Sequence, residues 1–274
     1  MAKLFGFVQF DFAGTLPLAD GRYLVGVPES GEETVLVVQL LAAPVAERRR
    51  RRGRPSPAEP EPAPVSLTRA TVIRAASPLE DQAGAARWLD ETCGDEDAVD
   101  LFATEAIKIL NQALHAQAVA AADPYGRRLS PEQAERMLVG YGSGEETADG
   151  CFTDARQVDV SPPTTSRRRR REEQLRPQER VAAILRGREQ LDACETLLLR
   201  ARADLDAGRD REAALQLRVG LEALLTELDG AVDDPDHLAD LASLRESQDD
   251  DQRSTAERLE IAQRVLRRRR VLRR

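Results

Sequence analysis

Three glycines, Gly140, Gly142 and Gly144, form the stretch of the sequence that comes nearest to a phosphate-binding loop. Such a loop gathers backbone N–H groups at the start of a helix, and the nucleotide-binding version ends in Lys followed by Ser or Thr. This stretch lacks that ending and the dinucleotide-binding spacing, and it is followed by Glu145 and Glu146, whose charges would repel phosphate. We therefore expect a polar hairpin loop over residues 142–150 that does not open a helix.

The chain has two histidines, His115 and His237, and three cysteines, Cys93, Cys151 and Cys194. Neither histidine has a second His or Cys three or four residues away, the spacing that places two metal ligands on one face of a helix. The cysteines are odd in number, far apart and without a Cys-x-x-Cys pair, which indicates reduced thiols. We expect no metal and no cofactor, although a site assembled in three dimensions from His115, Cys93 and Cys151 stays open.

Carboxylate pairs are numerous, but a chain with 48 acidic residues contains such pairs by chance. A catalytic acid needs a raised pKa, and therefore burial or a like charge beside it in a cleft. The pairs lie in stretches that we expect to be exposed: Asp90 with Glu91, Glu145 with Glu146, and Asp233 with Asp234. The sequence therefore names no catalytic residue. It favours a protein that is not an enzyme, without excluding one.

Arginine is concentrated in three clusters, at residues 48–54, 167–171 and 264–274. Guanidinium groups match phosphate oxygens, and basic arms can bind nucleic acid, a membrane surface or an acidic protein. Solvated spacers have the same composition, and the clusters could also dock on the acidic stretch 65–160 of this chain. The terminal cluster is the best candidate for anion or partner contact, and its arginines are Arg264, Arg267, Arg268, Arg269, Arg270, Arg273 and Arg274.

The N-terminal part of the chain alternates between strand and helix patterns. In the first strand, Val8, Phe10 and Phe12 fall on one side, and Gln9 and Asp11 fall on the other. The first three strands are expected to form an antiparallel meander. Strands are predicted at 3–12, 22–27, 34–41, 66–74, 137–141 and 151–160, and helices at 78–93, at 95–122 and briefly from residue 130.

Two changes of composition divide the chain. Residues 44–64 are rich in arginine and proline and cannot form a core, so we predict a disordered insertion within the first sheet. Residues 161–173 form a predicted basic, flexible linker. The expected domains are thus an α+β domain at 1–160, mostly an antiparallel sheet with two or three helices, and a C-terminal α-helical bundle at 174–274.

An antiparallel helical hairpin is predicted over residues 178–229. In its first helix, Ile184, Leu191, Leu198 and Leu205 recur every seven residues, with small residues at Gly187, Cys194 and Ala201 between them. Small residues on a seam let a second helix approach closely. Gly208 suits a left-handed helix end, and Asp210 can cap the second helix, whose apolar stripe is Leu217, Leu221, Leu224 and Leu228.

The stretch from Leu197 to Leu228, centred on Ala207 to Leu215, resembles a single tetratricopeptide-type helix pair. No second copy recurs at the period of about 34 residues, and a solenoid needs about three repeats to bury its faces. The pattern therefore favours an ordinary bundle hairpin. Two further helices are predicted, one at 235–245 and one that opens with a capping box of Ser254 and Glu257 and buries Leu259, Ala262 and Leu266.

Composition limits the possible functions further. The chain has 274 residues, a formal net charge of −8 and no apolar run near the roughly 18 residues that cross a membrane. The polar residues Gln9 and Asp11 interrupt the first apolar stretch, so we expect no secretory signal and a soluble cytoplasmic protein. The leading hypothesis is a non-enzymatic interaction or scaffold protein whose bundle binds another protein or itself. The alternatives are a nucleic-acid-binding protein that uses the arginine arms and an enzyme with its site in the N-terminal domain.

Overall fold

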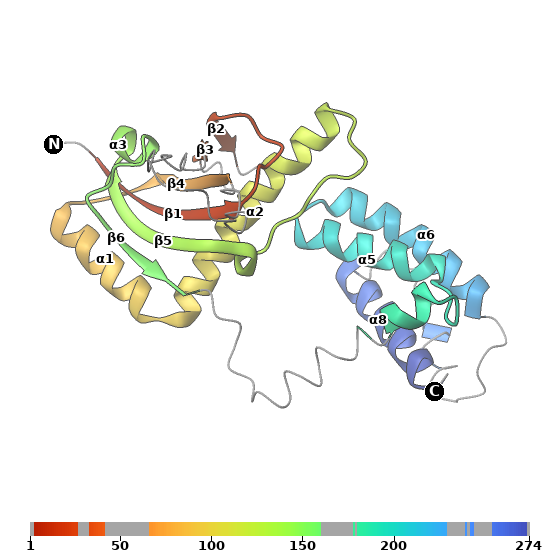
Figure 1. Ribbon diagram of the computed structural model, residues 1–274. Coiled ribbons are helices and arrows are strands. Elements are labelled where there is room, and N and C mark those ends of the chain that lie inside the picture. The colour runs from red at the N-terminus through yellow and green to blue at the C-terminus, as the bar shows by residue number, and fades with distance from the viewer. Residues whose placement is uncertain are drawn as a thin grey trace, which may run out of the picture. The chain divides into compact units, whose positions relative to one another are not determined.

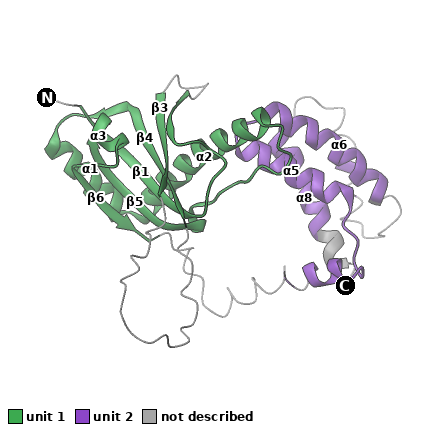
Figure 2. Cartoon of the chain, turned by 45° about the horizontal axis from the view of Figure 1, so that its top comes forward, with its two compact units in different colours: residues 1–164 green, residues 165–274 purple. Residues whose placement is uncertain are grey.

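The computed structural model describes residues 3–26, 33–41, 66–159, 180–228 and 254–272, and single positions at 178, 239, 242 and 243. The chain divides into two compact units, residues 1–164 and 165–274, which Figure 2 shows in different colours. The predicted insertion 44–64, the predicted linker 161–173 and most of the predicted helix 235–245 lie outside the described residues.

The first unit is an antiparallel six-stranded sheet with helices, so the predicted α+β class is confirmed (Figure 1). The strands are β1 (Leu4–Ala13), β2 (Gly21–Gly26), β3 (Glu33–Leu41), β4 (Leu67–Leu79), β5 (Ala134–Ser143) and β6 (Asp154–Val158). The helices are α1 (Gln82–Gly94), α2 (Glu96–Ala120), the 3-10 turn η1 (Pro131–Gln133) and α3 (Gly144–Ala148). The strand order across the sheet is β2-β3-β4-β1-β5-β6.

The predicted meander of the first three strands is wrong, because β1 does not pair with β2. Instead β1 lies inside the sheet between β4 and β5, while β2 pairs with β3. Burial explains the difference, since β1 is buried on both faces from Gly6 to Phe12. The strands β3 and β4 pair directly, with Leu41 opposite Leu67, so the chain on both sides of residues 44–64 belongs to one sheet.

Helices α1 and α2 cover one face of this sheet. On that face Val8, Phe10 and Phe12 belong to a core that also contains Leu89 of α1 and Leu110 of α2. The helices begin where carboxylates accept from their first N–H groups: Asp81 from Gly84, and Asp95 from Asp97. The predicted aromatic side of the first strand therefore faces the helices.

The opposite face of the sheet is covered in part by α3 and by the chain that follows it. The predicted polar loop at 142–150 is wrong on this point, because Gly144 to Ala148 forms a helix. Ala148 packs with Phe7, Val37 and Ile73 in a second small core. The ring of Phe152 lies 5.3 Å from that of Phe7. In Figure 1, α3 lies on the other side of the strands from α1.

The glycines that suggested a phosphate loop are explained by packing. Gly140 lies in β5, where an added Cβ would be 2.5 Å from the carbonyl oxygen of Asp154 and 2.7 Å from the ring of Phe7. A Cβ at Gly142 would be 2.5 Å from Oγ1 of Thr147. Strand β6 and the ring of Phe7 approach Gly140, and α3 with the chain after it approaches Gly142, so closely that only hydrogen fits at these two positions.

The second unit contains α5 (Ala193–Asp206), α6 (Asp210–Leu228) and α8 (Thr255–Leu272), which pack together. Their shared core is Cys194, Leu198, Ala201, Leu217, Leu221, Leu224, Leu259, Ala262, Val265 and Leu266. Gly220 of α6 marks a close approach, because a Cβ there would be 3.1 Å from Cδ2 of Leu198. The small residues at 194 and 201 are therefore buried in the helix contact, as their spacing predicts.

The first helix of the hairpin is not continuous, contrary to the prediction. Residues 180–185 are helical, and Gly187 then takes a left-handed conformation with φ +68° before α5 begins. The seven-residue spacing suggested one helix because it continued through Leu191, which is 54% exposed in the connecting segment. The glycine at 187 is a helix-ending residue rather than a seam position.

The predicted ends of the later helices are better matched. Gly208 has φ +69° in the turn between α5 and α6, although Asp210 is the first residue of α6 rather than its cap. The capping box before α8 is confirmed: Ser254 N–H donates to Glu257 Oε2 at 3.0 Å, and Glu257 N–H donates to Ser254 Oγ at 3.2 Å.

Substituting Gly140→Ala should destabilise the first unit by about 1 to 3 kcal/mol, because the new methyl group overlaps backbone and a fully buried ring. The free energy of unfolding from urea titration checks this. Gly94→Ala is the matched control, since nothing lies within 4 Å of its Cβ position. An equal effect at both positions would contradict the packing explanation.

Candidate interaction surfaces

A buried ion pair joins β1 to β4 on the face that carries α3. Asp11 is 5% exposed and lies directly opposite Arg69 in the strand register. Arg69 Nε donates to Asp11 Oδ1 at 2.8 Å, and its Nη2 donates to Oδ2 at 3.1 Å. This hydrogen bond raises the pKa of Arg69 against the opposing effect of burial. Because both carboxylate oxygens are occupied by the same guanidinium, we interpret the pair as a link between strands.

The edge strand β2 is exposed along most of its length. Gly21, Arg22, Leu24 and Gly26 are exposed, and Leu24 reaches 66% exposure. Among the strands that the structure describes, β2 pairs only with β3. Arg22 forms an exposed ion pair with Asp149, in which its Nη2 lies 2.6 Å from Oδ1 of the carboxylate.

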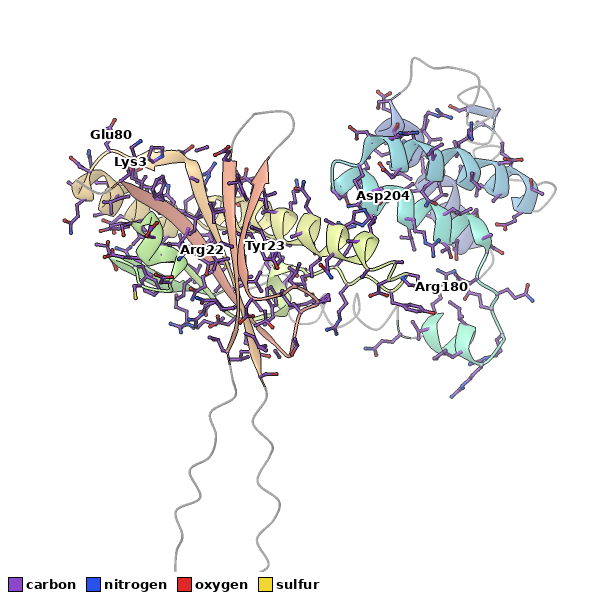
Figure 3. The ribbon with its side chains drawn as sticks, turned by 90° about the horizontal axis from the view of Figure 1, so that it is seen from above. Lys3, Arg22, Tyr23, Glu80, Arg180 and Asp204 are labelled. Atoms are coloured by element: carbon purple, nitrogen blue, oxygen red, sulfur yellow. The ribbon has the colours of Figure 1, made fainter. Side chains whose placement is uncertain are left out.

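Two hollows flank β2, one on each face of the sheet. The hollow on the α3 face has a volume of about 370 Å³, and its lining includes Leu24, Val35 and Ile73. The hollow on the α2 face has a volume of about 420 Å³, and Tyr23 and Val25 line it. Figure 3 shows Arg22 and Tyr23 on opposite sides of β2, as the two-residue period of a strand requires.

The N-terminus of α5 is capped by a side chain from the end of α6. The carboxylate of Glu227 accepts from the N–H of Ala193 at 3.1 Å and from that of Cys194 at 3.3 Å. It therefore satisfies two of the N–H groups that a helix leaves unpaired at its beginning. Burial, followed by the hydrogen bond with Glu227, raises the pKa of the Cys194 thiol to about 12.

Arg180 holds the chain that precedes α5. Its Nε donates to Glu189 at 2.6 Å, and its Nη2 donates to the buried carboxylate of Glu195 at 2.6 Å. Figure 3 marks Arg180 in this short helical segment. Both acids stabilise the charged guanidinium and raise the pKa of Arg180, although its partial burial acts in the other direction and is the largest single influence. These contacts fix the bend at which the predicted long helix is interrupted.

The second unit exposes large apolar side chains. Leu199 of α5 is 67% exposed, and Leu215 and Val219 of α6 are 50% and 47% exposed. Leu215 and Val219 are four residues apart, so they are neighbours on the outer side of α6. Both residues fall outside the buried stripe of α6 that the sequence predicts, and this apolar character off the stripe is the sequence signal that could have identified them.

The predicted terminal arginines are only partly within the described residues. Arg264 and Arg267 are exposed on α8, while Val265 and Leu266 between them are buried against the bundle. Arg267 Nε donates to the carbonyl of Gln263. Arg268, Arg269 and Arg270 lie within α8, but their side chains are not described, and Arg273 and Arg274 lie outside the described residues. Contact of this cluster with an anion or a partner stays a prediction.

The other candidate residues do not assemble into a site in the part of the chain that the structure describes. His115 is exposed on α2, Cys151 is exposed, and Cys93 is half-buried beside the core. No group of three or more His, Cys, Asp or Glu residues that could hold a metal ion occurs among the described positions. Within the same residues, no helix has the length and apolar character needed to cross a membrane.

The acidic pairs have separate roles. Asp90 pairs with Arg156 and thereby joins α1 to β6. Glu145 and Glu146 lie in the first turn of α3, where Ser143 Oγ donates to Glu146 at 2.6 Å. The glycine-rich stretch does open a helix, contrary to the prediction, but that helix begins with these two acids. Asp233 and Asp234 lie outside the described residues.

Comparison with known proteins adds no relative: no family model, no curated protein and no solved structure matches the chain.

Alkylation should distinguish the cysteines of the native protein. At about pH 8, Cys194 should react at least roughly a hundredfold more slowly than the exposed Cys151, because Cys194 is buried and its raised pKa leaves little of the reactive thiolate. Mass spectrometry after timed iodoacetamide treatment measures both rates. Similar rates at the two sites would contradict the closed arrangement around Glu227.

The raised pKa of Cys194 makes the stability of the second unit depend on pH. Because the folded-state pKa of Cys194 lies above its unfolded value, the stability it contributes is fully present below about pH 9 and is lost as the pH rises towards 12. The variant Cys194→Ala should lose stability at neutral pH but show a shallower decline over that range. Urea unfolding of the second unit at several pH values checks the sign.

Proposed function

We propose that the protein is a non-enzymatic interaction or scaffold protein that presents the outer surface of its C-terminal helices to a protein partner. The observation that carries this proposal is the pair of exposed apolar side chains one turn apart on α6, Leu215 and Val219. Leu199 is a further exposed apolar side chain, on α5. Apolar side chains gathered on a helix surface are typical of protein contact sites, whereas single exposed ones are ordinary.

The distribution of exposed apolar residues supports the same proposal. Twelve large hydrophobic residues are exposed in the described part of the chain, and six of them belong to the second unit, which contributes the smaller share of described residues. These six are Val181, Leu185, Leu191, Leu199, Leu215 and Val219. The inner side of the same helices is closely packed, so the outer residues are not needed to complete the core.

The double substitution Leu215→Lys and Val219→Lys should abolish capture of the partner, because two charges on the contact surface would be desolvated without compensation. The full-length chain is used as bait in an extract of the source cells, and captured proteins are quantified by mass spectrometry. We expect at least a tenfold loss of one or a few specific proteins. Circular dichroism confirms that the variant stays folded.

Leu101→Lys is the matched control, since Leu101 is 62% exposed on α2 of the other unit. It should capture the same proteins as the unchanged chain. A set of captured proteins that is identical for the unchanged chain and the double variant would count against the helical surface.

The alternative function is binding of nucleic acid through the terminal arginines. It is favoured by the arrangement of α8, in which Arg264 and Arg267 are exposed and their apolar neighbours are buried, so a rigid helix presents the charges. Removing the end of the chain would be a poor test, because Val265 and Leu266 belong to the core and truncation would damage the bundle.

Replacement of Arg264, Arg267, Arg268 and Arg269 by glutamine avoids that damage. If these arginines contact phosphate, binding measured by fluorescence anisotropy should fall at least tenfold between about 50 and 200 mM salt and should be lost in the variant. Binding by the unchanged chain that is insensitive to salt, or no binding at either salt concentration, would remove this alternative.

A further inference from the structure

The two edges of the sheet are protected differently. The edge strand β6 has five residues and carries Asp154 and Arg156, and the latter is paired with Asp90 of α1. The edge strand β2 contains neither lysine nor proline, and its pairing with β3 has no bulge. Its one charge, on Arg22, is engaged by Asp149 on one face of the sheet. Charges, prolines and bulges are the features by which proteins prevent strand pairing at an edge, and β2 has only this one charge, which is already paired.

The hollows beside β2 indicate what kind of segment would fit there. An added strand places successive side chains on opposite faces, so apolar residues at consecutive positions would enter the two hollows in turn. Tyr23 and Leu24 both border each hollow, and Val25 borders the one on the α2 face. The two-residue period of the strand places the side chain of Leu24 on the α3 face and those of Tyr23 and Val25 on the α2 face. A segment that pairs with the edge of β2 and fills both hollows therefore needs three consecutive apolar residues. Strand β2 itself has them, at Tyr23, Leu24 and Val25.

We infer that β2 pairs antiparallel with β2 of a second copy of this chain, joining the two sheets into one continuous sheet. The twofold axis passes through Leu24, so that each face of one sheet continues into the same face of the other. Leu24 then lies opposite its own copy on the α3 face, and Tyr23 lies opposite Val25 of the copy on the α2 face. Both hollows are thereby filled by side chains of the second copy.

Pairing chemistry favours this register over the one centred on Tyr23. Aliphatic pairs and pairs of an aromatic with a β-branched residue are the favourable cross-strand combinations, and both occur here. Arg22 falls opposite Gly26 of the copy, so its charge meets no apolar side chain and no like charge directly across. Moving the axis to Tyr23 would instead place Arg22 opposite Leu24 in the same hollow.

The first test is the mass of the full chain in solution. Light scattering after size-exclusion chromatography, from low micromolar to several hundred micromolar chain, should show a mass rising towards twice the 30.2 kDa of one chain. Leu24→Lys should give a monomer at every concentration, because lysine on an edge strand opposes pairing. Leu24 is 66% exposed, so circular dichroism should show the variant folded.

Two control variants separate this interface from other contacts. Leu101→Lys, with similar exposure on α2, should dimerise like the unchanged chain. The double variant Leu215→Lys and Val219→Lys should also keep its dimer, because the helical surface of the proposed function is a different one. A monomeric unchanged chain, or a dimer that survives Leu24→Lys, overturns the inference without affecting the proposed function.

A cysteine placed on the axis tests the register. In chains that also carry Cys151→Ser, Leu24→Cys should form an intermolecular disulfide under mild oxidation, because directly opposed Cα atoms are about 4.5 to 5.5 Å apart, within the range that a disulfide spans. Arg22→Cys should not, since its copy would be more than about 13 Å away along the strands. Cross-linking of both variants, or of neither, overturns the register.

Discussion

The sheet of the first unit has two faces to cover and long helices for only one of them. Helices α1 and α2 bury Val8, Phe10 and Phe12 on one face. The other face depends on the five residues of α3 and on the chain that follows it. Several separate features follow from this unequal cover, because a short segment has to lie very close to the strands to exclude water.

The close approach explains the glycines of β5 and the polar residues beneath. Gly142 lacks a Cβ where α3 and the chain after it approach β5, and Gly140 lacks one where β6 and the ring of Phe7 approach. Beyond the reach of α3, the central strand carries Asp11 rather than an apolar residue, and the bidentate contact with Arg69 compensates its burial. Towards β2 the cover ends, which leaves the hollow beside Leu24.

In the second unit, the apolar side chains are buried because small residues let the helices pack closely. Cys194, Ala201 and Gly220 let α5 and α6 approach, and Glu227 connects the end of one helix to the start of the other. The hairpin is therefore fixed at both ends, by the turn at Gly208 and by this carboxylate. The outer residues Leu215 and Val219 are not involved in either contact.

Strand positions were predictable because alternation is a local property of the chain, and the capping box of Ser254 was predictable for the same reason. The partner of each strand is not local, so the meander prediction failed when β1 proved to be buried on both faces. The seven-residue repeat wrongly predicted one continuous helix across Gly187, because a glycine suits both a close contact between helices and the end of a helix. The exposure of Leu24 could not be predicted from the sequence, since it depends on which strand lies at the edge.

The alignment of β3 with β4 has a consequence for the length of the chain. Leu41 lies opposite Leu67, and the register continues without a shift from there to Val35 and Ile73. The pairing is thus specified by the strands themselves. The residues between them need only connect the end of β3 to the start of β4. Because the entropy of closing a loop grows with the logarithm of its length, doubling that connection costs only about 0.6 kcal/mol. A longer connection would therefore leave the pairing of β3 with β4 unchanged.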